Sequence, residues 1–160
     1  DDNFTTSFMN LLNILPIFPL YHKGKTKFMP IHCSDLVEII YQVVSKNIIS
    51  TTIECIGPEV ISFKEILKKL TKLIEKKRLI MPIPLFIGKF SAKFFEIFPK
   101  PLITTDQINL LKYDNIPSGK YKTNYDIGMP SKRMFDLEVE KYAFMWKSEG
   151  QYSTNKYKID

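Results

Sequence analysis

The chain has 160 residues, of which 44% are hydrophobic and 25% charged, a composition that excludes a disordered polymer and gives one domain enough material for a core. It carries 23 basic and 17 acidic residues, and the net charge of +6 suits an acidic partner, an anionic cofactor or a membrane surface as well as a plain basic surface. No apolar run reaches the roughly 20 residues of a membrane-spanning helix, so we expect none.

The first predicted helix covers residues 3–13, because large apolar residues recur on one face at helical spacing. That face consists of Phe4, Phe8, Leu11 and Leu12. Asp1 and Asp2 read as its N-terminal cap. Since the chain opens on a helix cap without Met or a leader, we expect a longer protein with a segment upstream.

Prolines and a glycine organise the next stretch. Pro16 and Pro19 break the chain, and a basic turn over residues 21–27 centres on Gly24. The lysines of this turn, at 23, 25 and 27, suit either a phosphate contact or a solvated loop, and both readings stay open.

A strand and a helix follow the basic turn. Residues 28–32 predict a short strand, and Ser34 with Asp35 predicts the cap of a helix over 35–46. The expected buried side of this helix is Leu36, Ile39, Ile40 and Val43. Because two short strands cannot form a self-sufficient sheet, the second strand, at 51–57, indicates that further strands lie elsewhere.

The second half is mostly helical. Ser62 and Glu65 form a capping-box pattern that opens a helix over 63–76. Its inward residues are Phe63, Ile66, Leu67, Leu70 and Ile74. The expected elements after it are an extended piece at 79–84 and helices at 85–98, 105–113 (opened by a second capping box at 104–107) and 133–142.

The helix at 85–98 is rich in phenylalanine, with lysines on its polar side. Such a helix can lie in a membrane interface, contact a partner or fill a core. The candidate membrane or partner contacts are Phe86, Phe90, Phe94 and Phe95.

Motifs for chemistry are sparse. The glycine-rich GxGxxG and P-loop patterns and the GxSxG elbow are absent, and neither Tyr121 nor Tyr142 has a lysine four positions later, so this stretch alone is not expected to catalyse a reaction or bind a cofactor. His32 suits a general base or a packing residue. Aromatic residues do not alternate with arginine on a strand, and we expect no nucleic acid.

Cysteine usage argues against a disulfide framework and a metal centre. Cys33 and Cys55 are the only cysteines, so we expect reduced thiols in a reducing compartment. Together with His22 and His32 they show none of the spacings that place metal ligands on one side.

Three stretches, in order, resemble the second half of the extended and atypical short-chain dehydrogenase/reductases. They are residues 27–40, 53–67 and 101–115. The third, and the tail at 150–152, is similar to the branch that contains the accessory subunit of respiratory complex I (NADH:ubiquinone oxidoreductase) and its bacterial relatives.

The resemblance implies an α/β fold: the C-terminal portion of a Rossmann-type protein, with few short strands and a mostly helical substrate-side lobe. Residues 1–27 would supply a helix and loop of that lobe, residues 28–50 would return to an upstream Rossmann domain, and residues 51–160 would form the rest. The implied pocket residues are Phe4, Lys27, Phe28, Pro30 and His32. In the family's sugar-nucleotide epimerases an arginine that holds the diphosphate stands near the place of Phe28.

The leading interpretation is an NAD(P)-binding protein of the complex I type, with NADP or NAD held structurally in the full-length protein. It implies complex I subunits or a membrane surface as partners, in the bacterial cytoplasm or on the matrix side of the mitochondrial inner membrane. The alternatives are an active NAD(P)-dependent epimerase, dehydratase or reductase whose catalytic Tyr and Lys lie upstream, and a peripheral membrane or assembly module.

Overall fold

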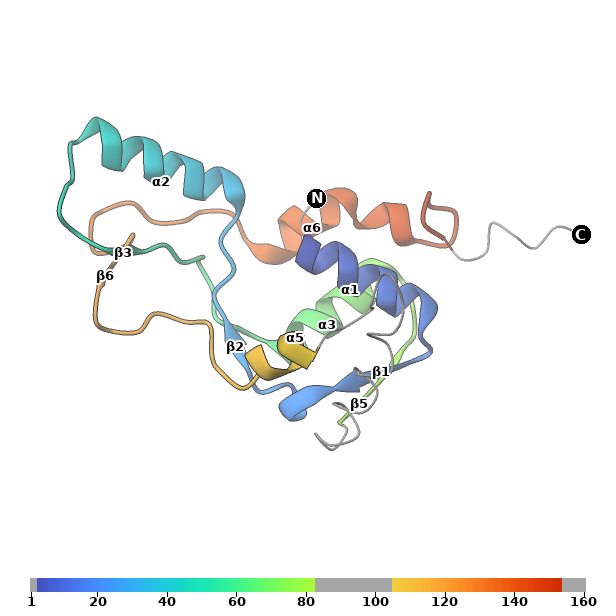
Figure 1. Ribbon diagram of the computed structural model, residues 1–160. Helices are drawn as coiled ribbons and strands as arrows, with labels where there is room; N and C mark the ends of the chain where they lie inside the picture. The colour runs from blue at the N-terminus through green and yellow to red at the C-terminus, as the bar shows by residue number, and fades with distance from the viewer. Residues whose placement is uncertain (1–2, 83–104, 154–160) are drawn as a thin grey trace, which may run out of the picture.

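The computed structural model describes residues 3–82 and 105–153 (Figure 1). The phenylalanine-rich segment at 85–98 and its four candidate contacts lie outside these residues. The described part is a mixed α/β structure with short strands, and it has two regions. We call the region that contains the hydrophobic core the core lobe, and the region around α2 (Cys33–Ser45), β3 (Ile53–Glu54) and β6 (Lys122–Thr123) the α2 lobe.

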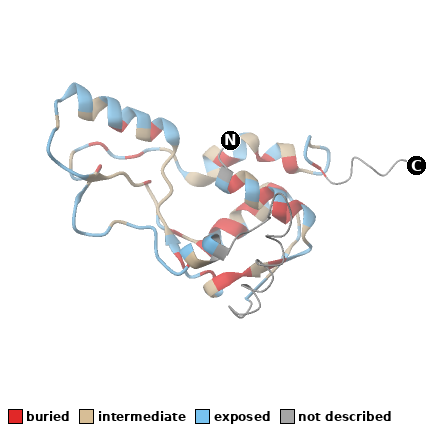
Figure 2. Ribbon diagram, in the orientation of Figure 1, coloured by how far each residue is buried: buried red, intermediate tan, exposed pale blue. Residues whose placement is uncertain are grey.

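The core lobe packs helices α1 (Asn3–Ile14), α3 (Phe63–Leu73) and α6 (Phe135–Ala143) with the short helix η2 (Phe144–Trp146). Figure 2 shows that the buried residues gather in this lobe. The fully buried large side chains of the core include Met9, Leu12, Phe18, Tyr21, Phe63, Ile66, Leu67, Leu70 and Ile74. The capping box of α3 is confirmed: the Ser62 hydroxyl accepts from the Glu65 N–H, and the Glu65 carboxylate accepts from the Ser62 N–H. The residues predicted to face inward on this helix are all buried, which confirms that prediction as well.

A parallel strand pair closes one side of the core lobe. Strand β1 (Ile17–Leu20) pairs with β5 (Leu79–Pro82), where the sequence predicted a proline break and an extended piece. Pro19 is tolerated in β1 because a strand with one partner needs only alternate N–H groups. Beside this pair, the Arg78 guanidinium donates to the carbonyl oxygens of Leu12 and Asn13 and so caps the C-terminal end of α1.

The basic turn forms as predicted. The short helix η1 (Tyr21–Gly24) contains three residues with positive φ, and Gly24 has φ +65°. Strand β2 (Lys27–Phe28) then pairs antiparallel with β4 (Ile61–Ser62). Strand β2 is shorter than the strand predicted over 28–32. Helix α5 (Thr105–Leu110) is likewise shorter than predicted.

Helix α2 forms where the sequence predicts it, but its cap and its buried face differ from the prediction. The N-cap is His32, whose Nδ1 accepts from the Ser34 N–H at 3.2 Å, whereas Asp35 lies in the first turn and is buried. Asp35 does not cap the helix, because its carboxylate accepts from Lys132 and Arg133 instead. Ile40 was predicted to be buried and is 53% exposed. Ile39 is the one hydrophobic residue of α2 that is buried.

The α2 lobe is held by polar groups more than by apolar ones. Strands β3 and β6 pair in parallel over two residues each. Asn124 is fully buried: its side-chain oxygen accepts from the Ile56 N–H at 2.9 Å, and its amide donates to the Met129 carbonyl and the Ser131 hydroxyl. Ser131 in turn donates to the Ile56 carbonyl at 2.7 Å. The loops of this lobe are therefore joined by a satisfied hydrogen-bond network.

Candidate functional site

A cavity of about 500 Å³ lies at the junction of the two lobes. Its walls come from the start of α1, the segment between β2 and α2, and the segment that leads into α6. This volume falls within the range of small-molecule sites in proteins.

One wall of the cavity is aromatic. The ring centroids of Phe4 and Phe28 are 5.9 Å apart, and both residues line the cavity. Two more rings pack against this wall: the ring centroid of Phe8 lies 4.9 Å from that of Phe4, and the ring centroid of Phe63 lies 6.3 Å from that of Phe28. Because Phe63 is fully buried, this wall is anchored in the hydrophobic core. Phe135 contributes a third ring to the lining.

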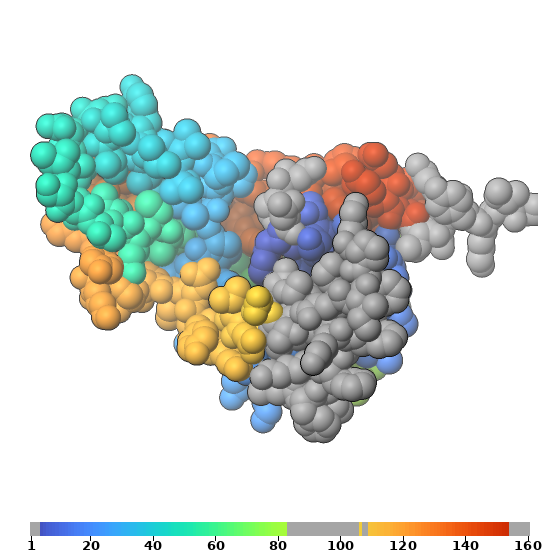
Figure 3. Space-filling view, in the orientation of Figure 1, coloured from blue at the N-terminus to red at the C-terminus, as the bar shows by residue number. Residues whose placement is uncertain are grey.

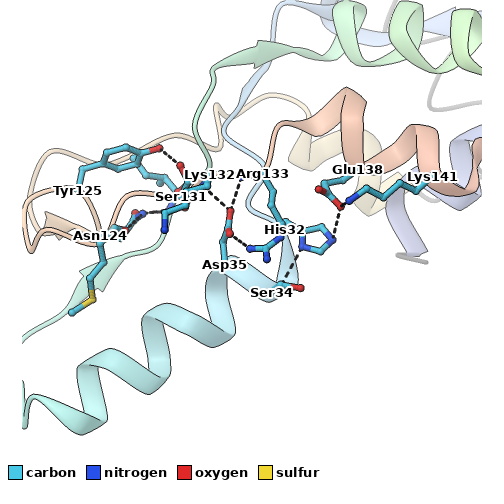
Figure 4. A network of polar contacts seen from close by, with 12 residues as sticks. His32, Ser34, Asp35, Asn124, Tyr125, Ser131, Lys132, Arg133, Glu138 and Lys141 are labelled. Atoms are coloured by element: carbon cyan, nitrogen blue, oxygen red, sulfur yellow. Dashed lines mark hydrogen bonds and ion pairs between the residues drawn. The ribbon is translucent and has the colours of Figure 1, made fainter.

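Arg133 lines the cavity and forms an ion pair with the buried Asp35 (Figure 4). Asp35 is 4% exposed, and its Oδ2 accepts from the N–H groups of Lys132 and Arg133, both at 2.9 Å. Its Oδ1 accepts from the Arg133 guanidinium. Burial raises the pKa of this carboxyl, but the two backbone N–H groups and the guanidinium outweigh burial and hold its pKa below the ordinary value.

His32 and Glu138 form a second polar pair at the cavity. The Nε2 of His32 lies 3.7 Å from Oε2 of Glu138, and the Lys141 ammonium donates to the same carboxylate oxygen at 2.6 Å. The Lys141 hydrogen bond, followed by smaller charge effects, lowers the pKa of Glu138. Because His32 accepts through Nδ1 from Ser34, a neutral imidazole presents its N–H at Nε2, toward the carboxylate.

A network of ion pairs joins α6 to α3. Lys69 donates to Asp136 at 2.7 Å and lies 3.5 Å from Glu59. Burial lowers the pKa of Lys69, but these two carboxylates outweigh burial and raise it. Glu59 also accepts from the Phe135 N–H at 3.1 Å, at the start of α6. This network positions the helix that carries Glu138.

The structure brings together most of the pocket residues that the sequence named. Phe4, Phe28, Pro30 and His32 line the cavity, whereas Lys27 is not among the lining residues. Whether the cavity binds a ligand remains a prediction.

Sequence reasoning did not assign Arg133, Asn115 or Glu138 to the cavity. Glu138 is half-buried at the cavity, whereas Glu140 on the same helix is exposed. No local motif marks these residues, because their partners are far away in the sequence. Asn115, for example, joins β2 by donating its N–H to the Lys27 carbonyl at 2.7 Å.

Other chemistry is sparse in the described part of the chain. Over residues 3–82 and 105–153 no three His, Cys, Asp or Glu side chains cluster as metal ligands would. Cys33 is exposed and Cys55 partly buried, and both are free thiols; burial raises the pKa of Cys55. Among the described helices, none combines the length and apolar character needed to cross a bilayer.

Comparison with known proteins gives a likeness of fold. No family model matches the chain, and no curated protein does. Among solved structures, the chain resembles a dTDP-4-dehydrorhamnose reductase from Clostridium acetobutylicum, with a TM-score of 0.56 and 16% sequence identity. The match covers 89% of this chain and 43% of the reductase chain, so this chain spans less than half of the reductase's length. At this identity the likeness supports the α/β fold class that the sequence predicted.

Proposed function

We propose that this chain is the pocket-forming lobe of an NAD(P)-binding protein of the short-chain dehydrogenase/reductase type. In this proposal a dinucleotide-binding domain outside the chain holds NAD or NADP, and the cavity between the two lobes receives the second ligand. The fold likeness to part of a reductase supports the proposal, as do the three sequence stretches that resemble this family.

The exposed apolar stripe of α2 carries the proposal. Val37, Ile40, Tyr41 and Val44 follow the spacing of one helix face, and each is more than half exposed. An apolar face of this size on a helix is stable when another element covers it. Figure 3 shows α2 and the segment after α5 at one end of the molecule, and Figure 2 shows how much of α2 is exposed there.

The strands beside α2 support the same interpretation. Strands β3 and β6 pair in parallel over only two residues each, which is too short for a stable sheet by itself. In this proposal the pair lies at the edge of a larger sheet. An adjoining Rossmann domain would supply strands and also cover the α2 stripe. Residues 28–50, which contain α2, are accordingly proposed to pack on that domain.

Calorimetry with NADPH and NADH tests the proposal on the protein with its native flanking sequence. We expect saturable binding of one dinucleotide per chain. Absence of heat and of a thermal shift with either dinucleotide contradicts the proposal.

Within this proposal, the cofactor has a structural role and the protein is of the complex I accessory type. The resemblance of residues 101–115 supports this branch. The second candidate is an active reductase or epimerase, which the name of the structural neighbour favours. Reading the flanking sequence separates the two: an intact Tyr-x-x-x-Lys with a nearby Ser or Thr supports the enzyme, and its loss supports the structural role.

A further inference from the structure

We infer that the cavity between the lobes takes an uncharged, largely apolar ligand and not an anionic nucleotide. This inference rests on the proposed function, because it assigns a ligand class to the same cavity.

The charged groups at the cavity already have partners of opposite charge. Arg133, the cation among the lining residues, is bound by the buried carboxylate of Asp35. Glu138, the lining carboxylate, is bound by Lys141 and faces His32. An anionic ligand that recruited Arg133 would compete with Asp35 for the guanidinium, whose Nη1 already donates to that carboxylate.

Asp35 also fixes the backbone next to the Arg133 side chain. The same carboxylate accepts from the N–H groups of Lys132 and Arg133, so its position is fixed by three donors from one segment. The N–H groups that might otherwise bind a phosphate are therefore occupied.

The remaining lining fits an apolar ligand. Phe4, Phe28 and Phe135 present rings, and Met29, Leu36 and Met134 add flexible apolar surface. Aromatic rings together with methionine suit a planar or branched hydrocarbon body. Asn115, at the same cavity, gives such a ligand a neutral hydrogen-bonding group.

Fluorescence titration with Nile red, a neutral apolar dye, tests the inference on the protein with its native flanking sequence, with and without NADPH. We expect one saturable site, and we expect thymidine diphosphate at millimolar concentration to leave it unchanged. Phe4→Ser should weaken dye binding about ten-fold, because it removes a ring of the aromatic wall. Phe4 is 42% exposed, so the variant is expected to fold.

Phe144→Ser is the matched control. Phe144 is 59% exposed on η2 and does not line the cavity, so its loss should leave the dye affinity within two-fold. The inference is overturned if the dye does not saturate, if both variants weaken it equally, or if thymidine diphosphate displaces it. NADPH calorimetry on the same sample reports on the proposed function separately: normal NADPH binding with any of these results overturns the ligand class alone.

Discussion

Asp35 and Arg133, which are 98 positions apart in the chain, form an ion pair whose carboxylate is buried beneath the start of α2. The pair joins the α2 lobe to the segment that leads into α6, and its Arg133 lines the cavity. One buried carboxylate therefore contributes three contacts to the junction of the lobes.

Asp35→Ala should lower the free energy of unfolding by about 2–3 kcal/mol, because it leaves the N–H groups of Lys132 and Arg133 and the guanidinium without their acceptor. Urea denaturation followed by circular dichroism measures the change. Glu38→Ala, an exposed carboxylate on the same helix, is the control and should change stability by less than about 0.5 kcal/mol. Equal effects of the two variants would contradict the role given to Asp35.

The same pair predicts a pH dependence. The folded-state pKa of Asp35 lies below the ordinary aspartate value of 3.8, so the charged carboxylate stabilises the fold fully above that value. This stability is lost as the pH falls through the folded-state pKa. The stability difference between the wild type and Asp35→Asn should therefore be constant above about pH 5 and shrink below about pH 4. Denaturation curves from pH 7 to pH 3 measure it, and a difference that grows in acid would show the opposite linkage.

Gly57→Ala should destabilise the protein by about 3 kcal/mol, because a Cβ at this position would lie 1.8 Å from the Pro30 carbonyl oxygen. The Gly57 N–H also donates to the Met29 carbonyl at 3.2 Å, so the two backbones cannot separate freely. Gly128→Ala is the matched control: a Cβ there meets open space, and only the positive φ of +72° costs about 1 kcal/mol. Thermal melts of both variants compare the costs, and a Gly57 cost no larger than that at Gly128 would show that the contact can relax.

Local signals in the sequence were enough to predict some elements and not others. The capping box at Ser62 and the apolar spacing of α3 determine that helix by themselves, and both predictions are confirmed. The cap of α2 was assigned to Ser34 and Asp35, and that was wrong because Asp35 binds a segment 97 or more positions away. Long-range pairing of this kind has no local pattern. The family resemblance named Phe4 and Phe28, which line the cavity, but it gave no sign of the Asp35–Arg133 pair.

The double variant Ile40→Ser with Val44→Ser tests the proposed cover of the α2 stripe. In the protein with its native flanking sequence, we expect a loss of about 2 kcal/mol of stability, because two apolar side chains would leave an interface. In this chain alone both residues are more than half exposed, so the change should be under about 0.5 kcal/mol. Chemical denaturation of both forms measures the contrast.

Leu137→Ser, an exposed position on α6, serves as the control and should behave alike in the two forms. The proposed cover would be wrong if the double variant had the same small effect with and without the flanking sequence.

Helix α1 is held by residues that are synthesised far later. The Trp146 indole donates to the Asn10 side chain, 136 positions earlier, and the Asn13 amide donates to the Tyr152 carbonyl, 139 positions later. The apolar face of α1 can pack on α3 once residues 63–73 have emerged from the ribosome, whereas these two hydrogen bonds form only when almost the whole described chain has been synthesised. Trp146 is the single tryptophan of the chain and is buried, so its fluorescence reports on the packing of the core lobe.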